Sequence, residues 1–268
     1  MVLENSFNKL IKARHGTLLY NKNDIYIGKS IEKYGEFSYL EAKIFEQICK
    51  AGDVVIEVGA NIGAHTLYLS KLVGNGYVFA FEPQRLVFQN LCANLALNSI
   101  SNVFAYQEAV SNENGTIIIP ECNFKENNNF GGINIENTKN GTTVNKQKLD
   151  NFLNKINRLK LLKIDVEGME ISVIKGASEL IKKFRPMIYV ENDRQEHSKE
   201  LIELLWSLDY KMYWHLPKLY NENNFFNDKE NIFGNIVSVN MFCIHKDSNI
   251  KILDMTEVLD SSFHPMKR

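Results

Sequence analysis

The chain alternates between short apolar runs and amphipathic stretches. Val54 to Val58 is apolar apart from Glu57, and Tyr77 to Phe81 forms a second apolar run. The segment between them, Ala64 to Leu72, has the apolar spacing of a helix. Buried parallel strands appear as continuous apolar runs because helices cover both faces of their sheet. The alternation therefore predicts an α/β fold, built on a mostly parallel sheet with helices on both faces.

The same patterns place further elements along the chain. Strands are predicted at residues 103–106, 116–119, 142–144, 159–164, 187–190, 211–215 and 236–245. Helices are predicted at residues 39–49, 86–97, 151–156, 169–175 and 196–208. Ser38 and Glu41 are expected to form a capping box for the first of these helices, and Asp150 to cap the third. The last strand is expected to pair antiparallel with the strand before it.

Three segments are distinguished along the chain. They are an N-terminal appendage at residues 1–34, a main domain at residues 35–247 and a C-terminal tail at residues 248–268. Within the appendage, apolar spacing predicts a helix over 6–13, and the apolar runs at 17–20 and 25–27 predict a β-hairpin. The polar segments 121–141 and 217–234 are predicted to be long loops.

Composition and charge limit the classes of function. Hydrophobic residues make up 44% of the 268 residues, which is enough for a full core. The formal net charge of −1 and the pI of about 6.6 provide no overall basic field, so no nucleic-acid partner is expected. The four cysteines lack C-x-x-C spacing, and no apolar run reaches the length of a membrane span. The N-terminal segment is charged where a signal peptide would be apolar, so a cytoplasmic location is expected.

A glycine turn joins the first apolar run to the helix after it. The turn consists of Gly59, Ala60, Asn61, Ile62 and Gly63. Ligands of open α/β sheets bind at such turns, and a dinucleotide site would have a glycine in place of Asn61 to admit the pyrophosphate. Glu57, just before the turn, would repel phosphate but attract a cation. These residues favour S-adenosylmethionine, which has an ammonium group and no phosphate, and Thr66 in the following helix is a further candidate contact.

The ends of the next two strands supply candidate ribose and adenine contacts. Glu82, followed by Pro83, ends the second apolar run about 20 residues beyond the glycine turn. An acidic residue at that spacing binds the ribose hydroxyls of a nucleoside. Gln107, Glu108 and Ala109 follow the third strand, where polar and small residues suit an adenine ring. We therefore predict that a nucleoside binds across these three strand ends.

Carboxylates also follow the fourth and fifth strands of the predicted sheet. They are Asp165 and Glu191, and solvated carboxylates rarely end buried parallel strands. Both are candidate catalytic residues, and Asp165 is also a candidate to position the methionine moiety of the cofactor. His215 has a suitable intrinsic pKa for a base, although it also fits a half-buried strand histidine. Asp165, Glu191 and Asn192 could offer oxygen ligands to Mg²⁺, but no His/Asp cluster has a diagnostic spacing, so no metal site is predicted.

Several stretches carry a resemblance to a known family. VVIEVGANIGAHT, FEP, KIDVEGMEISVIKGA and RPMIYVE resemble the FkbM-type S-adenosylmethionine-dependent methyltransferases. The resemblance spans roughly residues 35–191 and implies a Rossmann-like class I methyltransferase fold with a seven-stranded sheet. It also implies O-methylation of a hydroxyl on a sugar, a glycan precursor or a secondary metabolite. It assigns the cofactor turn to Glu57, Gly59, Asn61 and Gly63, the ribose carboxylate to Glu82, and the Asp-x-Glu-Gly motif to Asp165, Glu167 and Gly168.

Two other classes of function stay open at this point. An NAD-dependent oxidoreductase could use the same type of sheet, and Asn61 is the residue that opposes it. A non-catalytic binding module could keep the fold, and the acidic residues at four strand ends oppose that reading. The acceptor is expected to be a small molecule or a sugar. Its identity, the general base, any assistance by a metal and the oligomeric state are not specified by the sequence.

Overall fold

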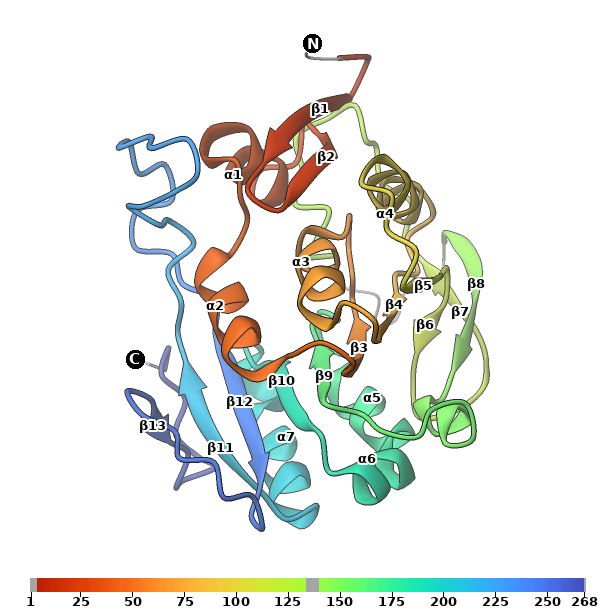
Figure 1. The fold of residues 1–268 in the computed structure, drawn as a ribbon, viewed down its shortest axis with the longest axis vertical. Helices are drawn as coiled ribbons and strands as arrows, with labels where there is room; N and C mark the ends of the chain where they lie inside the picture. Colours follow the sequence, from red (N-terminus) through yellow and green to blue (C-terminus); the bar gives the residue numbers. More distant parts are fainter. Residues whose placement is uncertain (1–3, 134–139, 268) are drawn as a thin grey trace.

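Eight strands form the main sheet in the part of the chain that the computed structural model describes, residues 4–133 and 140–267. They are β3 (Val54–Val58), β4 (Tyr77–Phe81), β5 (Val103–Tyr106), β9 (Leu161–Ile164), β10 (Met187–Glu191), β11 (Tyr210–His215), β12 (Asn240–His245) and β13 (Thr256–Glu257). Their order is β13-β11-β12-β10-β9-β3-β4-β5 (Figure 1). Seven of these strands confirm the predicted ones. The two-residue β13 is an addition at the edge beside β11.

The strand register brings the carboxyl ends of five parallel strands to one edge of the sheet. Strands β5, β4, β3, β9 and β10 run parallel, whereas β12 is antiparallel to β10 and β11, as predicted for the last strand. Ile164 is aligned with Val58 on one side and with Val190 on the other. Asp165 and Glu191 follow directly, so the two carboxylates emerge from neighbouring strands at the same edge.

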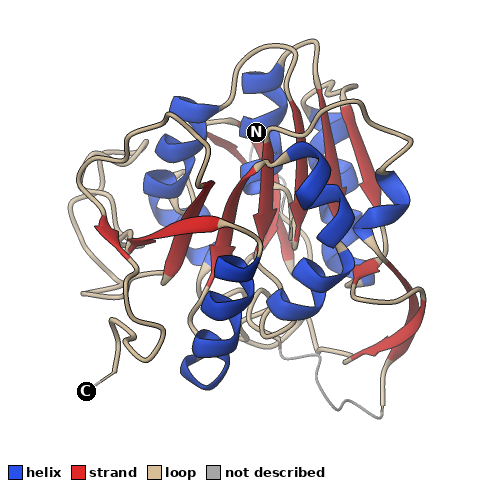
Figure 2. Cartoon of the chain, turned by 90° about the horizontal axis from the view of Figure 1, so that it is seen from below, coloured by secondary structure: helices blue, strands red, loops and turns tan. Residues whose placement is uncertain are grey.

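Helices cover both faces of the sheet (Figure 2). They are α1 (Ile27–Tyr34), α2 (Tyr39–Ile48), α3 (Ala64–Val73), α4 (Arg85–Leu97), α5 (Glu170–Gly176), α6 (Ser178–Phe184) and α7 (Gln195–Ser207). One core cluster packs α5, α6 and α7 against Ile56, and another packs Phe45 of α2 and Leu69 of α3 against Val55. Successive strand side chains point to opposite faces, so Glu57 lies on the face that α2 and α3 cover. None of the helices in the described ranges has the length and apolar character that crossing a membrane requires.

The N-terminal segment forms a hairpin followed by α1. Its strands are β1 (Asn8–Ala13) and β2 (Gly16–Asn21). The predicted helix over 6–13 is wrong because residues 8–13 form β1 and pair with β2. The predicted strand over 25–27 is also wrong because the Asp24 side chain accepts backbone hydrogen bonds that start α1 there. Asn94 of α4 and Asn98, which follows that helix, bond to the backbone of β2, so the hairpin packs on the main domain, whose boundaries stay a prediction.

A smaller sheet lies beyond β5. It consists of β6 (Ala109–Val110), β7 (Gly115–Ile119) and β8 (Thr142–Gln147), in the order β6-β8-β7. Strands β7 and β8 confirm the predictions at 116–119 and 142–144. Of the predicted loop at 121–141, residues 134–139 lie outside the described part of the chain. The described part of this loop packs on the N-terminal hairpin, where Phe124 O accepts a hydrogen bond from Asn21.

Two predicted helix caps are wrong. In place of a helix over 151–156, Leu149–Phe152 forms a short 3₁₀ helix. The Asp150 carboxylate accepts a hydrogen bond from the N–H of Leu180 at 2.8 Å, so it serves the start of α6. Ser38 makes no capping bond to the backbone of α2, because its hydroxyl donates to the Glu41 carboxylate at 2.6 Å.

Candidate active site

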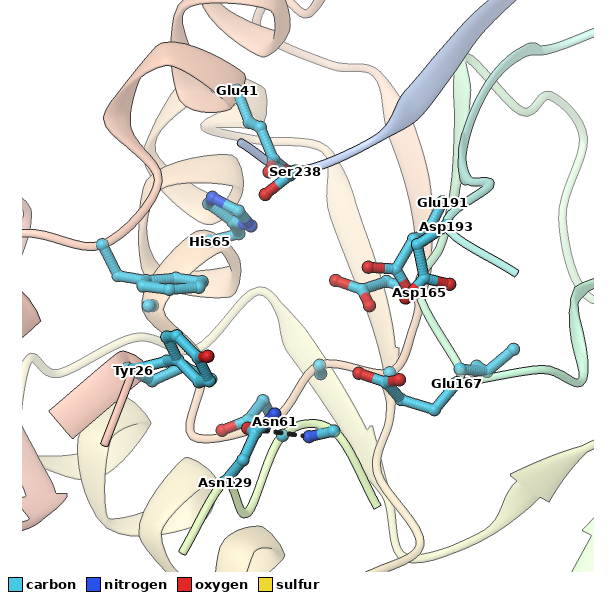
Figure 3. A pocket seen from close by; sticks show the side chains of 18 of the residues that line it. Tyr26, Glu41, Asn61, His65, Asn129, Asp165, Glu167, Glu191, Asp193 and Ser238 are labelled. Carbon is cyan, nitrogen blue, oxygen red and sulfur yellow. Dashed lines mark hydrogen bonds between the residues drawn. The ribbon is translucent and has the colours of Figure 1, made fainter. Parts of the chain in front are cut away.

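A cavity of about 460 Å³ lies at the carboxyl edge of the sheet (Figure 3). It is bounded by the turn after β3, the ends of β4, β9 and β10, the start of α1 and of α2, and the segments 129–133 and 236–240. Seven of its lining side chains are carboxylates: Glu41, Glu57, Glu82, Asp165, Glu167, Glu191 and Asp193. Two are permanent cations, Lys163 and Arg194. The volume suits a small-molecule ligand, and the charges make the cavity strongly acidic.

The glycine turn packs tightly against the end of β9. Gly59 has φ of +81°, and a Cβ atom there would lie 1.7 Å from the carbonyl oxygen of Asp165. Only glycine fits a backbone of this conformation at so close an approach. Asn61 also has a positive φ of +49°, and its N–H donates to Glu82 at 3.0 Å. The turn is therefore held between two neighbouring strands, with its backbone on the cavity wall.

Glu82 is buried at the end of β4. Its Oε2 accepts a hydrogen bond from the N–H of Asn61 at 3.0 Å, and its Oε1 accepts one from the N–H of Gln84 at 2.8 Å. Burial raises the pKa of Glu82 to about 7, although these backbone bonds act in the opposite direction. Each carboxylate oxygen has two lone pairs, so each can accept one further hydrogen bond from a ligand.

Glu57 and Lys163 face each other across β3 and β9. Thr66 Oγ1 donates to Glu57 Oε2 at 2.6 Å, so Thr66 acts by holding this carboxylate. Lys163 Nζ lies 3.1 Å from Asp165 Oδ2 and 3.9 Å from Glu57 Oε1. Burial raises the pKa of Glu57 to about 7. Burial alone would lower the pKa of Lys163, but the charges of Asp165 and Glu57 outweigh it and raise that pKa above its ordinary value.

Asp165, Glu167 and Glu191 converge on one part of the cavity wall (Figure 3). One oxygen of each lies within 4.8 Å of the other two, a spacing at which hard oxygen ligands could hold a divalent cation. Burial and then the charge of Asp165 raise the pKa of Glu167 to about 8, and the same causes raise the pKa of Glu191 well above its usual value. Asn192 turns away and donates to Ser198 at 3.0 Å. The omission of a metal stays a prediction.

The structure brings most of the predicted site residues together. Those that line the cavity are Glu57, Gly59, Ala60, Asn61, Glu82, Pro83, Asp165 and Glu191. Those that do not are Gly63, Thr66, Gln107, Glu108, Ala109 and His215. Ala109 is in β6, and Glu108 accepts a hydrogen bond from Gln147, so the predicted adenine segment joins the small sheet. His215 Nδ1 lies 2.7 Å from the hydroxyl of Tyr189, and burial lowers the pKa of His215.

Four charged lining residues were not among the predicted site residues. They are Glu41, Lys163, Asp193 and Arg194. Two of them leave a signal in the sequence, because Lys163 interrupts an apolar strand and Glu41 lies on the buried face of an amphipathic helix. Arg194 leaves none, since its partner Glu167, 2.7 Å away, comes from a different strand end.

Comparison of the sequence relates this chain to known proteins. The family model described as Methyltransferase FkbM domain matches residues 57–212. The curated protein Methyltransferase sdnD of Sordaria araneosa is 27% identical over 181 residues, with 54% of this chain and 70% of the relative covered. Hexuronic acid methyltransferase AglP of Haloferax volcanii is 26% identical over 175 residues, with 65% of this chain and 69% of the relative covered.

Comparison of the fold agrees with the family match. The precorrin-6y C5,15-methyltransferase from Geobacter metallireducens superposes with a TM-score of 0.50 at 12% identity, covering 76% of this chain and 87% of that chain. This likeness shows a Rossmann-like class I methyltransferase fold, as the sheet order also indicates. The matched residues 57–212 make up more than half of the chain and run from the glycine turn through the acidic ends of β4, β9 and β10. The chain therefore belongs to the FkbM family of methyltransferases.

Proposed function

We infer that the protein transfers the methyl group of S-adenosylmethionine to a hydroxyl oxygen of a sugar or another small molecule. The observation that carries this proposal is the acidic cavity at the glycine turn, where seven carboxylates accompany two cations. S-adenosylmethionine has an ammonium group and a sulfonium centre but no phosphate, so such a cavity attracts it and repels a pyrophosphate. Membership of the methyltransferase family supports the same cofactor.

The residues around the turn fit the parts of this cofactor. The remaining lone pairs of Glu82 suit the two ribose hydroxyls. Glu57 and Asp165 share the single cation of Lys163, so when both are ionised they leave a net charge of −1 for the cofactor ammonium. Gly59 lets the turn approach the end of β9 closely, which keeps the backbone of the turn on the cavity wall. When bound, the cofactor supplies an electrophilic methyl group.

Glu191 is the proposed general base. Transfer to a hydroxyl requires a group that takes the hydroxyl proton while the oxygen approaches the methyl carbon in line with the sulfur. Among the described residues, Glu191 lines the cavity wall and its Oε2 has no hydrogen-bond partner. Burial and the charge of Asp165 raise the pKa of Glu191 well above its usual value, so its ionised form is a strong base for this proton. Asp165 is paired with Lys163 at 3.1 Å and therefore serves to position the cofactor.

The remaining cavity wall supports a polyhydroxylated acceptor. Tyr26 and Phe37 offer ring faces for stacking on a sugar ring, and Asn129, Ser238 and Asn240 offer neutral hydrogen-bonding groups. The relative named as a hexuronic acid methyltransferase also supports a sugar acceptor.

Turnover with labelled cofactor tests this proposal. Purified protein is incubated with methyl-labelled S-adenosylmethionine and a panel of sugars, glycosides and nucleotide sugars, and the products are analysed by mass spectrometry. We expect a methyl ether on one class of acceptor, and loss of turnover in Asp165→Ala. Label found on nitrogen or carbon would overturn the hydroxyl as acceptor. Near-normal turnover of the Asp165→Ala variant would remove the role given to that residue.

A further inference from the structure

The buried ammonium of Lys163 has so far been described only as the partner of Glu57 and Asp165. Lys163 belongs to β9, between Leu162 and Ile164 of the apolar core, and its side chain is only 2% exposed. An unpaired ammonium in such a place would cost several kcal/mol, so its partners must compensate for its loss of water. It also lines the cavity, which sets it apart from a charge that merely fills the core.

The compensating partners are the carboxylates that line the cavity beside it. Lys163 Nζ donates to Asp165 Oδ2 at 3.1 Å and lies 3.9 Å from Glu57 Oε1. The register explains this contact, because Glu57 of β3 is aligned with Lys163 across the parallel pair. The titratable groups that face the ammonium are Glu41 from α2, Glu57 from β3, His65 from α3 and Asp165, which follows β9 directly. Tyr189 of β10 is aligned with Lys163 across the parallel pair.

Stability alone is a weak reason for this arrangement. Replacing a buried ion pair by apolar side chains of similar size is often neutral or stabilising. The cluster instead has a consequence at the cavity wall, because Glu57 and Asp165 are fixed by one cation between them. Thr66 holds the second oxygen of Glu57 at 2.6 Å, so this carboxylate is restrained from two sides.

We propose that Lys163 is a positioning residue, whose ammonium holds the Glu57 and Asp165 carboxylates in place beside the ammonium group of the cofactor. This inference rests on the proposed function of the same cavity. Without the lysine, the Glu57 and Asp165 carboxylates would repel each other, and burial would favour the protonated form of Glu57. A protonated or reoriented carboxylate attracts a cationic ligand less, so the affinity for the cofactor would fall. The pH at which binding reaches half its maximum would rise.

The test compares Lys163→Met with Lys163→Arg and with the control Lys160→Met. Lys160 precedes the same strand and neither lines the cavity nor forms an ion pair among the described residues. Calorimetry measures the Kd of S-adenosylhomocysteine at several pH values, and thermal unfolding follows stability. We expect Lys163→Met to weaken binding by about 10- to 100-fold, because a charged hydrogen bond of the carboxylates is lost. We also expect the pH at which binding is half-maximal to rise, because the neighbouring positive charge is lost.

The arginine variant keeps the test valid if the methionine variant does not fold. It retains the charge but displaces it, so we expect a wild-type pH midpoint with weakened affinity. A purely structural lysine predicts a lower melting temperature with wild-type Kd and pH midpoint in each folded variant, and that result would overturn the proposal. Failure of the wild-type protein to bind S-adenosylhomocysteine would instead overturn the proposed function and this inference with it.

Discussion

Substitution of Gly59 by alanine tests the geometry of the glycine turn. The added Cβ would lie 1.7 Å from the carbonyl oxygen of Asp165, far inside an ordinary contact of about 3.5 Å. The positive φ of +81° adds a cost of about 1–2 kcal/mol for any residue with a Cβ. Relief of the overlap requires a backbone shift, which costs about 1–3 kcal/mol in a packed region. The free energy of unfolding is therefore expected to fall by about 2–5 kcal/mol in Gly59→Ala.

Gly234→Ala is the matched control. Gly234 has a positive φ of +57°, but a Cβ there would meet nothing within 4 Å. In this variant the free energy of unfolding is expected to fall by only about 1–2 kcal/mol, the cost of the positive φ, and the affinity for S-adenosylhomocysteine is expected to stay unchanged. Denaturant unfolding followed by circular dichroism gives both losses, and effects on the unfolded chain cancel between the two variants. Equal losses in the two variants would refute the close approach of the turn to β9.

The remaining predictions concern the charged groups. Glu82→Gln is expected to weaken S-adenosylhomocysteine binding by about 10- to 100-fold in calorimetry, while the exposed control Glu200→Gln leaves it unchanged. Glu191→Gln is expected to lower kcat by about 10²- to 10⁴-fold in steady-state kinetics, with cofactor affinity retained; full activity would exclude it as the base. Affinity for S-adenosylhomocysteine is expected to rise as the pH increases through about 7, because Glu57 and Glu82 have pKa values near 7. Only deprotonated Glu57 attracts the ammonium group, and only deprotonated Glu82 accepts both ribose hydrogen bonds. Excess EDTA is expected to leave turnover unchanged, and a loss that Mg²⁺ restores would assign a metal to the acidic cluster.

The central sheet could be predicted because its signals are local. The apolar runs of β3 and β9 are each buried on both faces, and each ends in a residue type that breaks the run. The N-terminal strand β1 could not be predicted in the same way. Over six residues, apolar spacing does not separate a helix from a strand, and the partner strand β2 decides the outcome. The short β13 likewise depends on its contact with β11.

The candidate site likewise contains residues with local sequence signals and residues whose place depends on tertiary contacts. Glu57, Glu82, Asp165 and Glu191 could be predicted because parallel strands bring their carboxyl ends to one edge. The contribution of Arg194 to the cavity could not, because it depends on a contact with Glu167 from a different strand end. His215 ends β11, but its ring bonds the hydroxyl of Tyr189, and neither residue lines the cavity. Position along a strand thus predicted the edge of the sheet, and side-chain direction decided which groups reach the cavity.

The most direct test of the account is the choice of ligand at the glycine turn. Calorimetric titration of the wild-type protein with S-adenosylhomocysteine and, separately, with NADH measures that choice. An acidic cavity around Glu57 and Glu82 predicts one bound S-adenosylhomocysteine per chain and no heat of binding from NADH. Binding of NADH, or no binding of S-adenosylhomocysteine, would contradict the account.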